Sequence, residues 1–175
     1  MKTETKIINS IQLGLLLLMI ISSSQVSARD PAKIIAGYVE NIKIETQDYN
    51  IKAKLDTGAR TSSIHGINIE PFKKDGERWL KFTLLLIDSK GDKHELLLEK
   101  PRSRRTNVKN HDGEHDKRYV VDLEICFNNQ KYLTEFTLAD RNQYIYDVLL
   151  GRQFLNKIAV IDPEEIFLTS TKNCN

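Results

Sequence analysis

The 175-residue sequence contains few of the residue types on which metal and nucleotide sites depend. It has two cysteines and four histidines, and no His-Glu-x-x-His motif, so no recognisable zinc motif is present. It also lacks a glycine-rich phosphate loop, which excludes the commonest kind of ATP site. Basic residues exceed acidic residues by only two, so the charge balance does not require a nucleic acid or an anionic membrane as partner.

Long apolar runs are scarce, and the main one lies near the N-terminus. Lys2 and Lys6 precede the run Ile11–Ile21, which is shorter than the ~20 residues that span a bilayer. Small residues follow and end at Ala28, which is typical of a cleaved secretory signal. We therefore predict a signal peptide over residues 1–28, with cleavage after Ala28 and a periplasmic or secreted protein. An uncleaved N-terminal anchor is the alternative.

The expected mature chain, residues 29–175, is long enough for one domain with a buried core. Its 24 basic and 23 acidic residues nearly balance, and we expect neither a nucleic-acid partner nor stable membrane insertion after signal cleavage. Cys126 lies on the more polar face of its predicted strand and Cys174 on the C-terminal tail. An even cysteine count permits a disulfide in an exported protein. Two unpaired thiols are equally open, because spacing does not fix connectivity.

Short alternating segments dominate this part of the sequence. Leu123, Ile125 and Phe127 would face one side of a strand, and turn signals at Asp88–Asp92 and Asn128-Asn129 separate such segments. Short strands at this spacing predict an all-β fold, a small closed barrel, with one short helix at about Arg152 to Lys157. The expected strands are Ile34–Val39, Ile42–Glu45, Ile51–Leu55, Thr61–Ile69, Trp79–Ile87, Glu95–Leu98, Tyr119–Phe127, Tyr132–Leu138, Val148–Leu150, Ala159–Ile161 and Ile166–Leu168.

The most informative motif is Asp56–Ala59, Asp-Thr-Gly-Ala, which directly follows the predicted strand Ile51–Leu55. It puts one carboxylate on a tight turn, where Asp, Thr and a Gly with positive φ also have ordinary turn roles. Much later, the apolar segment Val148–Leu150 runs into Gly151-Arg152. A segment of that kind must pass beneath such a turn to support it. The ordered pair of motifs favours a hydrolase that works with two carboxylates sharing a proton.

In this order of elements the sequence resembles the retropepsin-like aspartic proteases. Tyr119–Phe127, Lys131–Leu138 and Asp147–Leu155 are similar to that family's hairpin after the flap, final inner strand and helix. The sequence resembles even more closely a bacterial family often labelled "ATP-dependent zinc protease", over about Ile35 to Leu168. The matching segments are Lys54–Ser62, Ile69–Phe72, Arg118–Val120, Leu149–Arg152 and Asp162-Pro163.

The resemblance implies an acid-protease-like (retropepsin) barrel and an aspartic endopeptidase that needs no cofactor. One carboxylate would activate a water molecule while its protonated partner donates to the peptide carbonyl. The chain carries one such motif, so the catalytic pair would be Asp56 from each of two copies, and we expect a homodimer that acts on a peptide or protein. The implied supporting residues are Thr57, Gly58, Ala59, Gly151 and Arg152.

The sequence departs from the viral members of the resembling family at Arg60. Those enzymes have an acidic residue there, which pairs with the arginine of Gly-Arg. Here Arg60 and Arg152 would place two like charges near each other, so we expect a dimer that forms differently, weakly or only on substrate. A polar segment at about 104–117 occupies the place of the substrate-covering flap, with His111, Gly113 and His115 as candidate flap residues. A disordered surface loop is the other interpretation of this segment.

Two alternatives to the peptidase remain. The first is a non-catalytic module on the same barrel that binds extended peptides by strand addition. The second is a zinc-dependent peptidase, for which His111, Glu114 and His115 are weak candidate ligands, although Gly113 argues against a helix that would align them. His65 shares a strand face with Ile67 and Ile69, and we expect it to be a hydrogen-bonded core residue.

Overall fold

The computed structural model describes residues 32–109 and 115–174. The chain divides into two compact units, Met1–Ala32 and Lys33–Asn175, and every element below belongs to the second. The predicted signal peptide, residues 1–28, lies outside the described residues. Within the described residues, no helix has the length and apolar character needed to cross a membrane.

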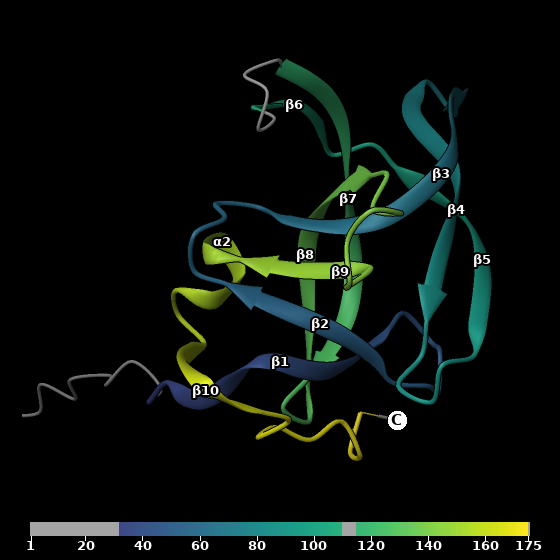
Figure 1. The fold of residues 1–175 in the computed structure, drawn as a ribbon. Helices are drawn as coiled ribbons and strands as arrows, with labels where there is room; N and C mark the ends of the chain where they lie inside the picture. The colour runs from purple at the N-terminus through teal and green to yellow at the C-terminus, as the bar shows by residue number, and fades with distance from the viewer. Residues whose placement is uncertain (1–31, 110–114, 175) are drawn as a thin grey trace, which may run out of the picture. The chain divides into compact units, whose positions relative to one another are not determined.

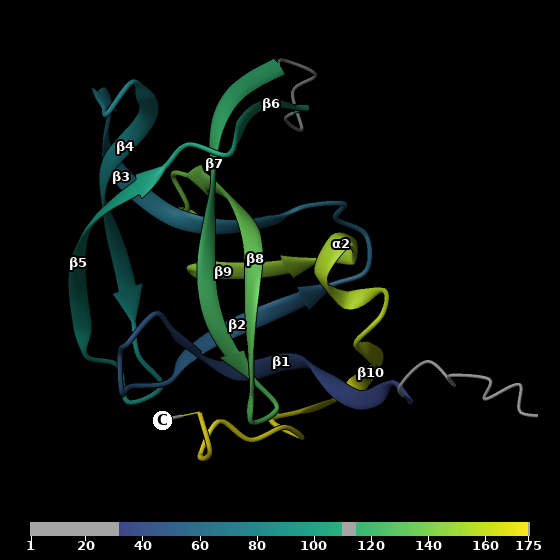
Figure 2. The same ribbon diagram turned by 180° about the vertical axis from the view of Figure 1, so that it is seen from behind.

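Six strands close into a barrel, as the alternating sequence predicts (Figures 1 and 2). Neighbouring strands pair in the order β1, β2, β9, β3, β8, β7, and β7 returns to β1 through Lys43 opposite Cys126 and Ile44 opposite Ile125. The barrel strands are β1 (Ile34–Ile44), β2 (Ile51–Asp56), β9 (Val148–Gly151), β3 (Ser62–Lys74), β8 (Gln130–Ala139) and β7 (His115–Phe127).

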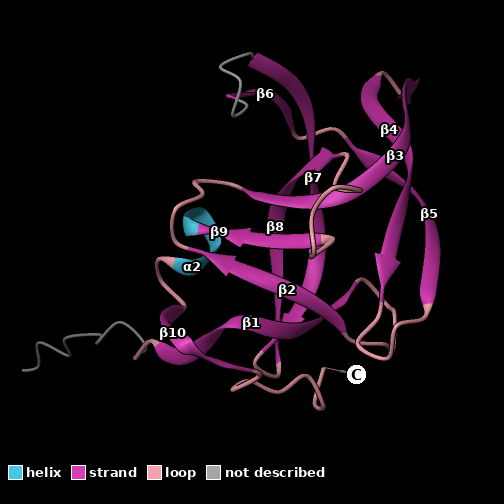
Figure 3. Cartoon of the chain, in the orientation of Figure 1, coloured by secondary structure: helices cyan, strands magenta, loops and turns pink. Residues whose placement is uncertain are grey.

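The remaining elements are attached to the barrel (Figure 3). Strands β4 (Glu77–Ile87) and β5 (Lys93–Pro101) extend the far end of β3 as a three-stranded sheet. Strand β6 (Arg104–Lys109) pairs with the start of β7, and β10 (Ala159–Ile166) runs parallel to β1. The short helix α2 (Arg152–Leu155) follows β9 directly. The all-β class and the short C-terminal helix are therefore confirmed.

Several predicted boundaries differ from the structure. The segments expected as separate strands before and after Asn41 form the single strand β1. Strand β10 ends at Ile166, and the strand expected at 166–168 does not form. The reason is that Phe167 takes a φ of 56° and its N–H donates to the Val39 carbonyl. Helix α2 ends at Leu155 rather than Lys157.

Period-two alternation accounts for the barrel core. Leu123, Ile125 and Phe127 are all fully buried on the inner face of β7, as predicted. Phe154 of α2 packs edge-on against Phe127 and Tyr132, with ring centroids 5.6 and 5.4 Å apart. These contacts seat the helix against the barrel and fix the segment that follows β9.

The turn between β7 and β8 contains only the two residues Asn128 and Asn129. Their φ angles are 49° and 61°, the left-handed values that match a two-residue hairpin turn to the strand twist, and asparagine tolerates them well. The predicted turn signal is confirmed here.

The C-terminal tail is fastened to the barrel at two places. Cys126 and Cys174 form a disulfide, which decides between the two possibilities that the sequence left open. Glu40 is completely buried, and its carboxylate accepts hydrogen bonds from the N–H groups of Gly37, Leu168 and Thr169 and from the Thr169 hydroxyl. A buried carboxylate is tolerated here because its lone pairs are satisfied.

We predict that the double variant Cys126→Ser, Cys174→Ser keeps the fold but loses about 4 kcal/mol of unfolding free energy. The disulfide closes a loop across a separation of 48 residues, and its removal restores that loop's entropy to the unfolded chain. Urea titration of the wild type, with and without a reducing agent, provides the matched control. Equal midpoints for all three samples would contradict the prediction.

Candidate functional site

The site begins at the turn that follows β2. Oδ1 of Asp56 accepts the N–H groups of Gly58 at 2.9 Å and Ala59 at 3.2 Å. These two bonds hold the carboxylate over its own turn, with a quarter of its side chain exposed. Its Oδ2 lies 3.5 Å from Nζ of Lys54, on the same strand.

The turn is supported from below by β9 and α2. Asp56 pairs with Gly151 at the end of the parallel β2–β9 ladder. Just beyond it, the guanidinium of Arg152 donates to the carbonyl oxygens of Thr57 and Gly58, both at 2.8 Å. The N–H of Arg152 donates to the Ala59 carbonyl at 2.9 Å. The two motifs singled out in the sequence therefore meet in the fold.

Close approach, rather than a left-handed φ, requires glycine at position 151 and leaves little room for a side chain at position 58. A Cβ at Gly151 would lie 2.6 Å from the carbonyl carbon and oxygen of Thr61. A Cβ at Gly58 would lie 3.1 Å from Oδ1 of Asp56. Only Gly76 and Gly91 have positive φ among the described glycines, so the positive φ associated with an ordinary Asp-Thr-Gly turn does not occur at Gly58.

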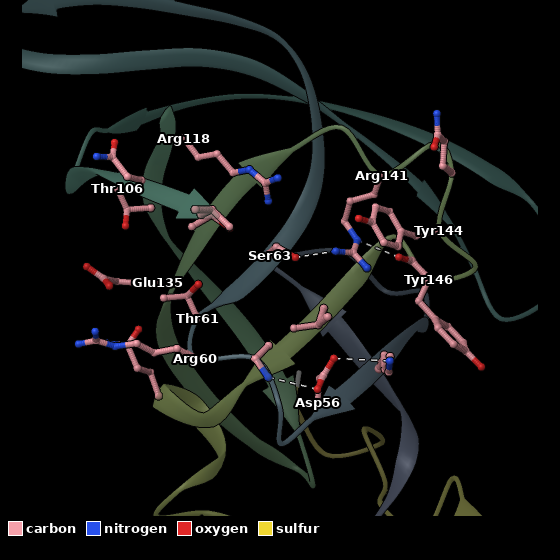
Figure 4. Close-up of a pocket in the computed structure, with 18 of the residues that line it drawn as sticks. Asp56, Arg60, Thr61, Ser63, Thr106, Arg118, Glu135, Arg141, Tyr144 and Tyr146 are labelled. Atoms are coloured by element: carbon pink, nitrogen blue, oxygen red, sulfur yellow. Dashed lines mark hydrogen bonds and ion pairs between the residues drawn. The ribbon is translucent and has the colours of Figure 1, made fainter. Parts of the chain in front are cut away.

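A large open cleft of about 1280 Å³ lies above the turn. Asp56 lies on its floor, with Arg60 and Glu135 toward one side and Arg141, Tyr144 and Tyr146 toward the other (Figure 4). The cleft has room for an extended peptide segment. Its described lining carries the cations Lys54, Arg60, Arg104, Arg118 and Arg141, against the two carboxylates of Asp56 and Glu135.

Arg141 is the least expected of these cations, because it is only 6% exposed. Its guanidinium donates to the Ser63 hydroxyl at 2.7 Å and to the Tyr146 carbonyl at 2.9 Å, and lies 4.7 Å from the centre of the Tyr144 ring. Burial lowers the pKa of Arg141, although an arginine stays charged. Among the described residues, no carboxylate lies within ion-pair distance of it.

Opposing influences act on Asp56. Burial raises its pKa, but the N–H groups of Gly58 and Ala59 and the ammonium of Lys54 lower it, and together they hold it below the ordinary value.

Glu135, the other carboxylate of the described cleft, is bound by two nitrogens of Arg104. That hydrogen-bonded partner holds the pKa of Glu135 low as well. Each chain thus presents one carboxylate on a braced turn.

The segment predicted as a flap is a hairpin rather than a loop in its described part. Residues 104–109 form β6 and pair with 115–120 of β7 in an antiparallel ladder, and Thr106, Asn107 and Val108 line the cleft. The alternative interpretation of this segment, a disordered surface loop, is therefore wrong for these residues. His111, Gly113 and Glu114 lie outside the described residues, and His115 is described only by its backbone in β7.

His65 is buried, as predicted, but only half of its ring is hydrogen-bonded. Its Nδ1 accepts the N–H of Arg141 at 2.8 Å, while Nε2 has no protein partner within the described part of the chain. In that same part, no three His, Cys, Asp or Glu side chains gather in a way that would hold a metal ion.

Several residues of the cleft were not predicted from the sequence. Lys54 was detectable, because period-two alternation puts it on the face of Asp56. The loop from Asp140 to Asp147 brings Arg141, Tyr144 and Tyr146 to the cleft. Its only sequence signal is the apolar stretch Tyr144–Tyr146 between two strands, where a polar turn is usual.

Comparison with known proteins identifies a matching family, similar curated proteins and a similar solved structure. A family described as "RimB-like: Retropepsin-like aspartic endopeptidase RimB" matches residues 35–172. A probable alpha-L-glutamate ligase of Shewanella pealeana is 41% identical over 122 residues, which is 70% of this chain and 26% of that protein. A second probable alpha-L-glutamate ligase, from Desulfotalea psychrophila, is 35% identical over 115 residues, which is 65% of this chain and 24% of that protein. The chain thus spans about a quarter of these relatives.

A crystal structure of a Legionella pneumophila protein of unknown function has a similar fold. It superposes with a TM-score of 0.66 at 29% sequence identity, covering 79% of this chain and all of that one.

Proposed function

The chain belongs to the RimB-like family of retropepsin-like aspartic endopeptidases, and from this premise we propose that it hydrolyses peptide bonds as a homodimer. The catalytic pair is Asp56 from each of two copies. The observation that carries the proposal is the braced turn, which holds Asp56 on the floor of the cleft by two backbone N–H groups. A single chain offers no equivalent second carboxylate in the described cleft, because Glu135 is bound by Arg104.

The proposed reaction uses one proton shared between the two carboxylates. Two carboxylates about 3 Å apart cannot both ionise readily, so the pair holds one proton. The ionised member takes a proton from a water molecule, which attacks the peptide carbonyl, and the protonated member donates to the carbonyl oxygen. The titration belongs to the pair and not to either Asp56.

The turn supports a dimer in this arrangement. Thr57 and Gly58 are exposed at its tip, where a second copy would meet them across a two-fold axis. Arg152 binds the turn carbonyls of its own chain, which provides an internal brace where viral relatives use an ion pair with an acidic residue. Arg60, which occupies the position of that acidic residue, lines the cleft.

We further propose that the substrate is an acidic peptide. The cationic lining of the cleft favours it, and so does Arg141, whose buried charge lacks a carboxylate partner within the described chain. A substrate carboxylate at Arg141 would compensate that charge. Relatives are named probable alpha-L-glutamate ligases, which fits a glutamate-containing peptide.

The test is a cleavage assay with a glutamate-rich peptide and a matched peptide in which every Glu is Gln. We expect kcat/KM to be on the order of tenfold or more higher for the acidic peptide, because each charge-assisted hydrogen bond contributes about 1.5–3 kcal/mol. EDTA should leave the rate unchanged. Faster cleavage of the Gln peptide would contradict the acidic preference, and EDTA inhibition reversed by zinc would favour a metallopeptidase.

A non-catalytic peptide-binding module is the second candidate. The observation that favours it is the ion pair between Lys54 and Asp56, which stabilises the ionised carboxylate that a proton-sharing pair must partly protonate. In that case the acidic peptide binds without being cut. We also propose export to an oxidising compartment, which the Cys126–Cys174 disulfide supports.

A further inference from the structure

Strand β2 presents three charged side chains in succession on one face. The strand alternates between buried and exposed residues, so Lys52, Lys54 and Asp56 point to the same side. Nζ of Lys54 lies 3.5 Å from Oδ2 of Asp56. The turn N–H groups hold only Oδ1, so Lys54 faces the carboxylate oxygen that the turn leaves available.

Resting on the function proposed above, we propose that Lys54 is a positioning residue that acts through Asp56 and sets the pH range in which the catalytic pair holds its shared proton. Two copies of Asp56 bring two like charges together, which favours protonation of the pair. Two copies of Lys54 oppose this effect. The assembled centre contains two ammonium groups beside two carboxylates, so the proton is retained only at a lower pH than without the lysines.

Other charged groups also face Asp56, but each has a different partner or distance. Arg152, on α2, donates to the carbonyls of the turn and not to the carboxylate. Arg141, from the β8–β9 loop, interacts with Asp56 through its charge, and its hydrogen bonds go to Ser63 and Tyr146. Arg60 and Glu135 line other parts of the cleft wall, and Glu135 is paired with Arg104. Lys54 is the cation within ion-pair distance of Asp56 in the described chain.

The position of Lys54 has a kinetic consequence. The reaction needs one carboxylate ionised and one protonated, so both limbs of the pH profile move with the charge beside the pair. An ammonium group beside the pair shifts both limbs of the pH profile toward acid pH. Its removal moves both toward neutral pH.

The experiment compares the wild type with Lys54→Met and with the control Lys52→Met. The control removes the same charge from the same strand face, about 7 Å farther along the strand, where solvent screens it more strongly. For each protein, kcat/KM for one acidic peptide is measured from pH 3 to 8. The peptide's own carboxyl groups titrate alike in all samples, so differences belong to the enzyme.

We expect the ratio of kcat/KM at pH 7 to that at pH 4 to rise on the order of tenfold in Lys54→Met. The control should stay within about twofold of the wild type. Lys54→Arg, which keeps the charge, should restore the wild-type profile. A Lys54→Met profile that coincides with that of the wild type, or an equal shift in Lys52→Met, would overturn the proposal.

A second measurement separates this inference from the proposed function. The ¹³C resonance of the Asp56 carboxyl, assigned by its loss in Asp56→Asn, is followed against pH in the same proteins. Its midpoint should lie at higher pH in Lys54→Met and stay unchanged in Lys52→Met. If no protein cleaves peptide, the proposed function fails, while this titration still decides whether Lys54 controls the proton. An unchanged midpoint would overturn the role of Lys54.

Discussion

Replacing Asp56 with asparagine is expected to lower kcat/KM for peptide hydrolysis on the order of 10³-fold or more. An amide can neither accept the proton of the attacking water nor donate one to the peptide carbonyl. Stability should change little, within about 1 kcal/mol, because the asparagine Oδ1 can still accept the N–H groups of Gly58 and Ala59 that now bond to Asp56. Cleavage assays and urea unfolding of the same preparations check both parts.

The matched control is Asp75→Asn. Asp75 is an exposed turn residue between β3 and β4 with a φ of 52°, a conformation that asparagine also accepts. This variant should cleave peptide at the wild-type rate. Equal turnover by wild type and Asp56→Asn would rule out the catalytic role of Asp56.

Gly151→Ala should cause a large loss of stability, roughly 3 kcal/mol or more of unfolding free energy. Its Cβ would lie 2.6 Å from backbone atoms of Thr61, which directly precedes the neighbouring strand β3, and this backbone cannot move aside as a flexible side chain would. The strain falls where β9 supports the Asp56 turn, so activity should fall more than stability alone explains. Chemical denaturation and cleavage assays below the unfolding midpoint measure the two effects.

Gly91→Ala is the control for this variant. Gly91 has a φ of +98° but nothing within 4 Å of the added Cβ, so alanine there adds backbone strain of about 1–2 kcal/mol without a clash. If Gly151→Ala were no more destabilising than Gly91→Ala, the close approach of the Thr61 backbone would not be what requires glycine at 151.

Local pattern predicted most of the fold. The alternation in β7 and the Asn128-Asn129 turn are set by neighbouring residues, so they were predictable. Strand β6 was not, because among the described residues it pairs only with β7 and its sequence Arg104–Lys109 carries little apolar alternation. Its strand structure depends on the ladder to β7, which no periodicity within β6 reveals.

The site was predictable in part for the same reason. The Asp56 turn and the Gly151-Arg152 support are short motifs whose chemistry is local. The hydrogen bond from Arg141 to Ser63 joins residues that are 78 apart in sequence. The buried Glu40 accepts a hydrogen bond from Leu168, which is 128 residues away. Such contacts depend on three-dimensional packing, which residue spacing does not encode.

The most direct test of the shared catalytic centre is to produce wild-type and Asp56→Asn chains together in varied ratios and to measure activity per wild-type chain. If the centre needs Asp56 from both copies, mixed dimers are inactive, and activity per wild-type chain falls to about half in an equimolar mixture. Activity per wild-type chain that stays constant at every ratio would contradict the account, because each chain would then be working alone.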